Sequence, residues 1–494
     1  MDELNWLVAL PEIVLLVAIG VVAIVDLYVT DPKRRLTFWL AQGSLALVAL
    51  LHLDALNAGQ SVIGMHGMLV SDPMGHLLAL FATIAVMVTI VYSQPYIASR
   101  QMLKGEFFTL AMFSLLGISV MVSANHFLVI YLGLEVMSLA LYALVALRRD
   151  DATATEAAMK YFVLGALASG FLLYGLSMMY GATGSLQLAE VFDAIQTGRI
   201  DETVLVFGLV FIVAGLAFKF GAVPFHMWVP DVYQGAPTAI TLLIAGAPKL
   251  AAFGMTIRLL HEGLNGLAAD WQQMLIVLAV ASLVIGNLVA IAQSNLKRML
   301  AYSTIAQVGF VLLGLTPIVV GGNTLSAANG YSSALFYLVT YVLTTLGTFG
   351  LVMLLARQGH ECDRIADLAG LSKRSPWLAG AMTVFMFSLA GIPPTVGFYA
   401  KLAVLQALVT TGSTGYIVLA VLAVLLSLIG AFYYLRVVKV MYFDEPADAT
   451  PITWLPQGAS ALLAVNGAAV LVLGLLPGGL MALCRDAIVK ALAG

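Results

Sequence analysis

The sequence predicts an all-α integral membrane protein with about fourteen transmembrane helices. Hydrophobic residues make up 61% of its 494 positions, and Asp, Glu, Lys and Arg make up only 10%. Soluble domains usually contain about 25% charged residues, so a water-soluble fold is excluded. The apolar segments are long and continuous, whereas a β-barrel would show alternating segments of about ten residues.

Apolar segments bounded by charged residues, proline or glycine predict the helices in order. In the first half they cover residues 5–29, 36–53, 74–98, 106–123, 126–147, 156–180 and 202–220. In the second half they cover residues 237–260, 271–293, 298–318, 328–356, 376–412, 415–442 and 458–482. The first segment is too long, and its flank too acidic, for a cleavable signal peptide.

Basic residues gather in alternate loops, and this asymmetry predicts the orientation in the membrane. One side carries Lys33, Arg34, Arg35, Arg100, Lys104, Arg148, Arg149, Lys160, Lys297, Arg298, Arg357, Arg364, Lys373, Arg374, Arg436 and Lys439. The other side carries only Arg199, Arg485 and Lys490. We expect the first side to be cytoplasmic and both termini to be periplasmic.

Composition and motifs exclude several kinds of binding. The formal net charge of −3 lacks the basic excess typical of nucleic-acid-binding proteins. The chain contains no G-x-G-x-x-G or G-x-x-x-x-G-K-[ST] motif, so it is not expected to bind NAD or ATP by itself. Cys362 and Cys484 are the only cysteines. We expect them on opposite sides of the membrane, where they form neither a disulfide nor a metal site.

Two predicted helices are interrupted by glycine and proline. The seventh breaks at Gly221 and Pro224, and the twelfth breaks at Gly391, Pro393 and Pro394. Broken membrane helices at matching places in two halves are typical of inverted repeats that line a polar cavity. The alternative is simple kinks that adjust helix packing. The repeat interpretation divides the chain into helices 1–3 (1–104), a first five-helix repeat of helices 4–8 (105–262), a second of helices 9–13 (263–443), and helix 14 (444–494).

Four ionisable residues are predicted near the middle of the membrane: Glu135, Lys219, Lys249 and Lys401. Each costs on the order of 3 kcal/mol at a helix centre, which favours a function. The alternative is ion pairs that only fix helix packing. Three lysines cannot all pair with one glutamate, so we expect at least one to be solvated by water or to lose its proton, as a proton carrier does. Lys219 and Lys401 adjoin the two breaks and are expected at equivalent depths.

Other polar residues are candidates for supporting roles. His226 follows the first break and either passes protons or only packs. Glu156 and Lys160 are one helical turn apart at the predicted cytoplasmic start of helix 6, where they form either a proton-uptake site or an ordinary surface pair. The predicted tenth helix carries hydroxyl and amide side chains at Tyr302, Ser303, Thr304 and Gln307. These side chains either hold a chain of water molecules or form hydrogen bonds with backbone carbonyls and neighbouring helices. Arg258 is expected to extend its side chain to the outer surface.

Four motifs in order resemble one known family. They are NHFLVIYLGLEVMSLALYAL from Asn125, AFKFGAVPFHMWVPDVYQGAPTAITLLIAGAPKL from Ala217, NLKRMLAYSTIAQVGF from Asn295 and GIPPTVGFYAKLAVL from Gly391. Together they are similar to the proton-antiporter-like subunits of respiratory complex I (NADH:quinone oxidoreductase) and of multisubunit cation/proton antiporters. The resemblance spans most of the chain and implies fourteen transmembrane helices with two inverted five-helix repeats.

The resemblance also implies a function. It makes the chain a non-redox, proton-translocating subunit of complex I in a bacterial plasma membrane, moving protons from cytoplasm to periplasm while quinone is reduced elsewhere. Glu135 and Lys219 would be the coupled pair, Lys249 the central relay and Lys401 the exit-side residue. The chain itself would hold no cofactor or metal. FMN, iron–sulfur clusters and quinone would belong to partner membrane and peripheral subunits, which include sister antiporter-like subunits.

Two other functional classes are consistent with the same residues. One is a subunit of a sodium/proton antiporter complex without a redox partner. The other is a membrane scaffold that anchors its neighbours and transports nothing. Whether this channel itself pumps or mainly transmits coupling is not determined by residue types.

Overall fold

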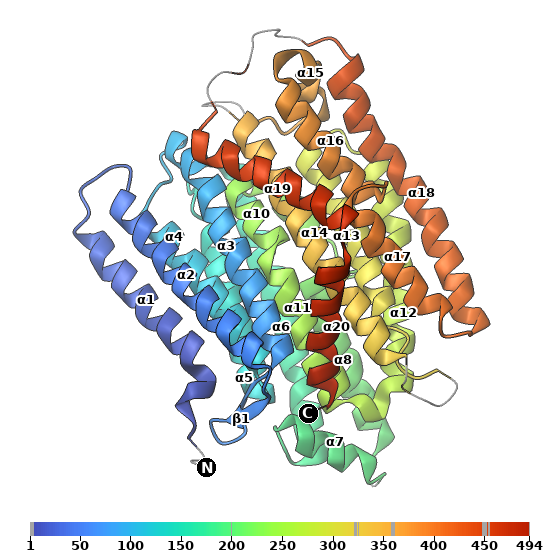
Figure 1. Ribbon diagram of the computed structural model, residues 1–494. Coiled ribbons are helices and arrows are strands. Elements are labelled where there is room, and N and C mark those ends of the chain that lie inside the picture. The colour runs from blue at the N-terminus through green and yellow to red at the C-terminus, as the bar shows by residue number, and fades with distance from the viewer. Residues whose placement is uncertain are drawn as a thin grey trace.

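The computed structural model describes residues 4–198, 200–320, 324, 326–356, 361–446, 452 and 455–493. They form a helical bundle in which both chain ends lie in the lower half of the view (Figure 1). Within these described residues, twelve helices are long and apolar enough to cross a membrane. The total of fourteen remains a prediction, since it also requires α13 (Leu296–Gly314) and the shorter pair α16 (Pro376–Ala390) and α17 (Val396–Val409) to cross.

The first half follows the predicted segments closely. Its long helices are α1 (Leu10–Leu27), α2 (Arg35–Ala58), α3 (Pro73–Ser99), α4 (Gly105–Ser123), α5 (Phe127–Val145), α6 (Ala152–Thr183) and α8 (Glu202–Phe220). Two elements were not predicted: the antiparallel hairpin of β1 (Val62–Gly64) and β2 (Leu69–Ser71), and the short amphipathic helix α7 (Leu188–Gln196). Both are too short to give an apolar segment of membrane length.

The second half contains more interruptions. Its remaining elements are α9 (Trp228–Gly235), α10 (Thr238–Ala245), α11 (Ala247–Thr256), a π-helical turn (Ile257–Gly263), α12 (Ala268–Ile291), α14 (Ala327–Leu355), α15 (Leu371–Arg374), α18 (Thr414–Phe443), α19 (Gln457–Leu475) and α20 (Gly478–Ala493). The loop between α1 and α2, which carries Lys33 and Arg34, and helix α15 both lie at the upper end in Figure 1. We call this end of the molecule the basic face.

The structure confirms both predicted breaks. Helix α8 ends at Gly221, whose φ is 76°, and α16 ends at Gly391, whose φ is 82°. Glycine adopts this left-handed conformation without a steric penalty, which is why both helices stop there. Pro224 and Pro394 follow each glycine at the same distance along the chain. This shared construction supports the two inverted repeats and their boundaries, which remain a prediction.

Two predicted single helices are divided. The eighth segment breaks at Gly246 into α10 and α11, and Pro248 occupies the first turn of α11. The last segment does not continue to residue 482, because α19 ends at Leu475 and α20 starts at Gly478 after Pro477. Proline has no N–H to continue the helical hydrogen bonds. Figure 1 shows the chain changing direction between α19 and α20.

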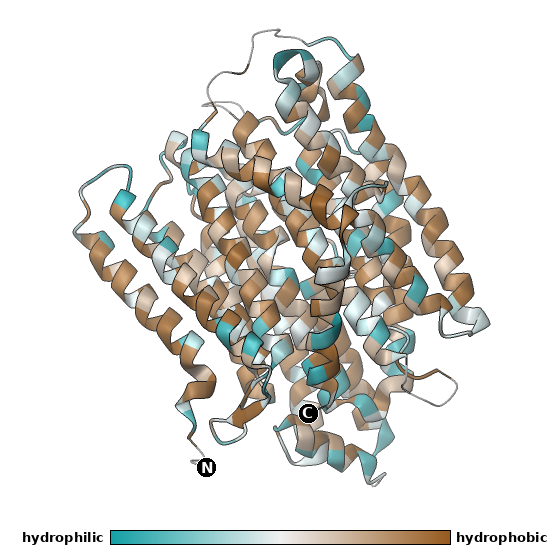
Figure 2. Cartoon of the chain, viewed as in Figure 1, coloured by the Kyte–Doolittle hydropathy of each residue, from teal (hydrophilic) through white to brown (hydrophobic). Residues whose placement is uncertain are grey.

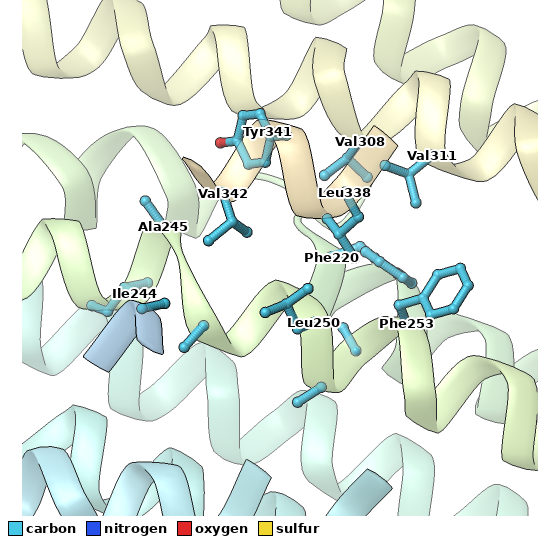
Figure 3. Packing of buried hydrophobic residues seen from close by; sticks show 14 of the residues in the cluster. Phe220, Ile244, Ala245, Leu250, Phe253, Val308, Val311, Leu338, Tyr341 and Val342 are labelled. Carbon is cyan, nitrogen blue, oxygen red and sulfur yellow. The ribbon is translucent and has the colours of Figure 1, made fainter. Parts of the chain in front are cut away.

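The most buried helices lie at the centre of the bundle. The span that contains α10 and α11 is 100% buried over its apolar window and α14 is 94% buried, whereas α18 is only 28% buried. Figure 2 shows apolar residues on the outward surfaces of the peripheral helices, as a lipid-facing surface requires. Figure 3 shows Phe220, Leu250 and Phe253 packed beside Val308 and other side chains of the central cluster. This core surrounds the helix breaks.

Candidate functional site

Lys249 caps the broken end of α8. Its Nζ atom donates hydrogen bonds to the carbonyl oxygens of Phe220 (2.6 Å) and Lys219 (3.3 Å), the last two residues of that helix. It also lies 5.5 Å from the ring centre of Trp228, and the residue is only 1% exposed. A helix end leaves unpaired carbonyls with partial negative charge, so an ammonium group is stabilised there without a carboxylate.

Lys401 has the same arrangement at the second break. Its Nζ atom donates to the carbonyl oxygens of Leu389 (3.1 Å) and Ala390 (2.9 Å), the last two residues of α16. It also donates to Ser427 Oγ (2.8 Å) and lies 5.3 Å from the ring centre of Phe310. The two breaks therefore each hold one lysine on two terminal carbonyls and beside one aromatic ring. In these contacts Lys401 matches Lys249 rather than Lys219. The equivalent depths expected for Lys219 and Lys401 remain a prediction.

Lys219 lies beside Glu135 without forming an ion pair with it. Lys219 Nζ donates to Ser138 Oγ (2.8 Å), which is three residues after Glu135 on α5. Glu135 Oε1 is buried and has no hydrogen-bond partner among the described residues. The two side chains are thus neighbours across α5 and α8, and the carboxylate has a free acceptor for an incoming proton or cation.

A charged cluster lies on the basic face at the start of α6. Lys160 Nζ contacts Glu156 Oε1 (2.8 Å) and Asp231 Oδ2 (2.8 Å), and Arg298 contacts the other Asp231 oxygen (2.7 Å). These residues line a pocket of about 190 Å³. The predicted Glu156–Lys160 pair is confirmed. The central residue of the charged cluster, however, is Asp231, which contacts both Lys160 and Arg298. Asp231 was missed because a single aspartate on a short helix after a break gives no periodic signal.

His226 and Tyr302 are less clearly connected. His226 is half-buried in the segment between α8 and α9, and its Nδ1 atom has no hydrogen-bond partner among the described residues. Tyr302 lies under the guanidinium of Arg298, 6.0 Å from its ring centre to Cζ. Tyr302 therefore adjoins the charged cluster and is not part of the hydroxyl network described next.

A hydroxyl and amide network extends from α13 toward Lys401. Gln307 Nε2 donates to Tyr434 Oη (2.9 Å) and to the Leu389 carbonyl (3.0 Å), the same carbonyl that accepts from Lys401. Further hydrogen bonds join Ser303 to Tyr434, Tyr337 Oη to Gln307 Oε1, and Tyr341 Oη to Thr304 Oγ1. Two cavities of about 10 Å³ each adjoin this network, which is about the space of one water molecule.

Two basic residues differ from their predicted positions. Lys297 was counted among the loop residues of the cytoplasmic side, but it is 4% exposed and donates from Nζ to the Ala236 carbonyl (2.8 Å). Arg258 does not extend to the surface, because it is 1% exposed and bound to Asp72 (2.7 Å) and Glu262 (2.6 Å). Ala236 and Asp72 are distant in sequence from the residues they bind, and Glu262 is one helical turn from Arg258, so hydropathy could not reveal these contacts.

The arrangement brings together groups that can transfer protons. The described residues include no group of three or more His, Cys, Asp or Glu placed to hold a metal ion. Both cysteines are buried. The groups that do converge are amines, carboxylates and hydroxyls, which exchange protons directly or through water, and amides, which hold them in place by hydrogen bonds.

Comparison with known proteins identifies the family. Residues 124–430 match the model described as NADH:quinone oxidoreductase/Mrp antiporter, transmembrane. The chain belongs to this family. The matched range contains Glu135, Lys219, Lys249 and Lys401. This membership confirms the expected all-α, antiporter-like membrane fold, while the fourteen helices and the two inverted repeats remain predictions.

Individual relatives extend the likeness to nearly the whole chain. The NADH-quinone oxidoreductase subunit N of Polaromonas naphthalenivorans is 63% identical over 99% of this chain and 98% of its own length. A chain of respiratory complex I from Thermus thermophilus is 32% identical over 96% of this chain and 98% of its own, with a TM-score of 0.79. A chain of the Mrp complex from Dietzia has a TM-score of 0.84 but only 20% identity, over 98% of this chain and 97% of its own, so it shows the fold alone.

Proposed function

We propose that this chain translocates protons as a membrane subunit of NADH:quinone oxidoreductase, and that Glu135, Lys219, Lys249 and Lys401 transfer them. The family and the 63% identity to a subunit N support the class of complex. Quinone reduction, FMN and iron–sulfur chemistry belong to other subunits of that complex. The chain supplies a path for protons and no redox centre.

The observation that carries the proposal is how the two break lysines are held. Lys249 and Lys401 bind terminal carbonyls and, in one case, a serine hydroxyl, and neither forms an ion pair within the described residues. A carboxylate partner would hold the proton on the amine and would remain as an uncompensated charge once the proton left. Carbonyl oxygens stay neutral. Either lysine can therefore gain or lose a proton without leaving a buried counter-charge.

The proposed route begins at the charged cluster of Glu156, Lys160 and Asp231 on the basic face. Lys219 and Lys249 follow, because Lys249 bonds to the backbone of Lys219 itself. The network around Gln307 adjoins Lys401, because both residues donate to the Leu389 carbonyl. That carbonyl accepts from both and carries no proton, so water in the two small cavities beside the network would pass the proton to Lys401. Glu135, with its free oxygen, is the group that changes partner and alters the proton affinity of Lys219.

Replacement by arginine tests this role. Arginine keeps the positive charge and donors but does not release its proton in proteins. Lys401→Arg should therefore lower proton pumping per NADH oxidised by at least about tenfold, as expected when a proton-transfer group is lost. The exposed Lys373 offers the control variant Lys373→Arg, which should pump normally. Normal pumping by assembled Lys401→Arg complex would show that Lys401 only fixes the packing.

A sodium/proton antiporter subunit is the alternative, because the matched family model also covers Mrp antiporters. Sequence identity favours the complex I subunit, because this chain is 63% identical to a subunit N and 20% identical to the Mrp chain. Purification of the native complex in mild detergent decides the matter. We expect flavin and iron–sulfur subunits to co-purify with this chain. Their absence from an otherwise intact assembly would favour the antiporter.

We place the chain in the bacterial inner membrane with the basic face toward the cytoplasm. The supporting observation is the predominance of Lys and Arg in the loops of that face. Protons would then move from the basic face to the periplasm, where both termini are proposed to lie.

A further inference from the structure

A groove outside the proton path lies between α2, α3 and the start of α19. Its cavity volume is about 790 Å³. Most of its lining is apolar and comes from Phe38, Gly43 and Ala46 on α2, Met87 and Val91 on α3, and Ala459 on α19. Helix α19 contacts α3, and Figure 1 shows it passing across the upper part of that helix.

The groove has the length of one membrane leaflet. Its lining positions on α2 run from Arg35 to Ala46 at helical spacing, and those on α3 run from Ala98 back to Met87. Eleven residues of helix extend about 16 Å, which is close to half of a hydrocarbon layer about 30 Å thick. The groove therefore starts at the basic face and ends near the middle of the membrane.

The open end of the groove is positively charged. Lys33 and Arg35 line it, are exposed, and have no ion pair with any described residue. Asp31 is the one acidic residue of this loop, and its Oδ1 accepts from the Lys33 backbone N–H (2.9 Å). That hydrogen bond, together with the charges of Arg35 and Lys33, lowers the pKa of Asp31. The neighbouring Arg34 is turned away and paired with Asp26 (2.7 Å).

We propose that this groove binds one anionic phospholipid from the leaflet on the basic face. The phosphate contacts Lys33 and Arg35, which are charge-complementary to it. Trp39, 70% exposed beside the same opening, lies at headgroup level as membrane tryptophans do. The acyl chains fill the apolar stripe between α2 and α3. The bound lipid joins these helices to α19, and the inference does not depend on the proton path.

Native mass spectrometry of the purified complex from nanodiscs tests the proposal. The nanodiscs contain phosphatidylglycerol and phosphatidylcholine in equal amounts, and the measurement is the retained lipid of each kind. Lys33→Gln/Arg35→Gln should weaken phosphatidylglycerol binding about thirtyfold, because each basic residue contributes about 1 kcal/mol near an anionic headgroup. Arg149→Gln/Lys373→Gln makes the same charge change on exposed residues outside the groove and should retain the lipid.

A second pair of variants tests the apolar part. Gly43 lines the groove, and a Cβ added there meets no atom within 4 Å, so Gly43→Trp is expected to fill the groove with its ring. Gly20 on α1 is equally open and lies outside the groove, so Gly20→Trp is the matched control. We expect Gly43→Trp to lose the retained lipid and Gly20→Trp to keep it.

Several outcomes would overturn the proposal. If phosphatidylcholine were retained as well as phosphatidylglycerol, the groove would not select an anionic headgroup. If the Lys33/Arg35 variant retained as much phosphatidylglycerol as the unchanged protein, these two residues would not bind the headgroup. Displacement of the lipid by inorganic phosphate alone would show that the site binds free phosphate. Cross-linking of a cysteine at position 43 to another subunit would show that a partner helix occupies the groove.

Discussion

At the scale of single residues, backbone carbonyl oxygens stabilise the buried lysines of the membrane region. Lys249, Lys297 and Lys401 all donate to carbonyl oxygens at or near helix ends. The sequence suggested pairing with acids as the alternative to a relay, but none of these three lysines forms an ion pair with a described residue. A broken helix thus provides a site for a cation that needs no acidic residue.

Asp231 is predicted to matter more than its neighbour Glu156. Asp231 bonds to both Lys160 and Arg298, while Glu156 contacts only Lys160 and its side chain is 66% exposed. Asp231→Asn should reduce NADH-driven proton pumping several-fold, and Glu156→Gln should reduce it less. The ratio of protons pumped to NADH oxidised is the measurement. Equal effects of both changes would contradict a central role for Asp231.

Asp72 is predicted to be important for stability. Its ion pair with Arg258 has side-chain exposures of 3% and 2%, so Asp72→Ala leaves a buried guanidinium with only Glu262 as its acidic partner. Loss of one partner of a buried pair costs about 3–5 kcal/mol. We expect a lower midpoint temperature when the purified complex is heated and its intact fraction is measured by size-exclusion chromatography. Lys373→Ala removes an exposed pair with Glu445 and should change that midpoint little.

At the scale of elements, the glycines at the breaks position the lysines. A Cβ on Gly391 would lie 2.8 Å from Lys401 Cδ and 3.3 Å from its Nζ. The helix end and the lysine that caps it are therefore packed against each other, and the break is a part of the site rather than a kink between packed segments.

Gly391→Ala should accordingly displace Lys401 and lower proton pumping. Gly412→Ala is the control, because Gly412 also has a positive φ of 69° but its added Cβ meets nothing within 4 Å. Both variants carry a similar backbone strain of roughly 1 kcal/mol, and only the first crowds the lysine. Pumping per NADH oxidised, measured in inverted vesicles, should fall for Gly391→Ala alone. A similar fall in both variants would attribute the effect to strain.

At the scale of the whole molecule, one central region holds the two halves together. Helix α14 contacts α3, α10 and α11 from residues 1–262 and α13, α16, α17, α19 and α20 from residues 263–494. Its burial of 94% leaves almost no surface for lipid. Tyr337 and Tyr341 on this helix bond to residues of α13, so the same element that packs the halves also lines the network toward Lys401.

The orientation of the molecule is testable with cysteine labelling. Asp150, in the loop between α5 and α6 on the basic face, and Glu202, at the start of α8 on the opposite face, are both exposed. A membrane-impermeant maleimide applied to spheroplasts should label Glu202→Cys and spare Asp150→Cys. Cys362 and Cys484 are buried and should give little background. The reverse labelling pattern would place the basic face in the periplasm and would contradict the proposed direction of proton transfer.

The sequence by itself determined the membrane class, the positions of most helices, both glycine–proline breaks and the four candidate ionisable residues. These features are local: hydropathy and helix-breaking residues act within one or two turns. The tertiary structure alone decided which groups hold each charge. The carbonyl that binds Lys297 is 61 residues away, and the aspartate that binds Arg258 is 186 residues away. A buried charge is stabilised by whatever polar atoms the packed helices bring to it, and that depends on the arrangement of the whole bundle.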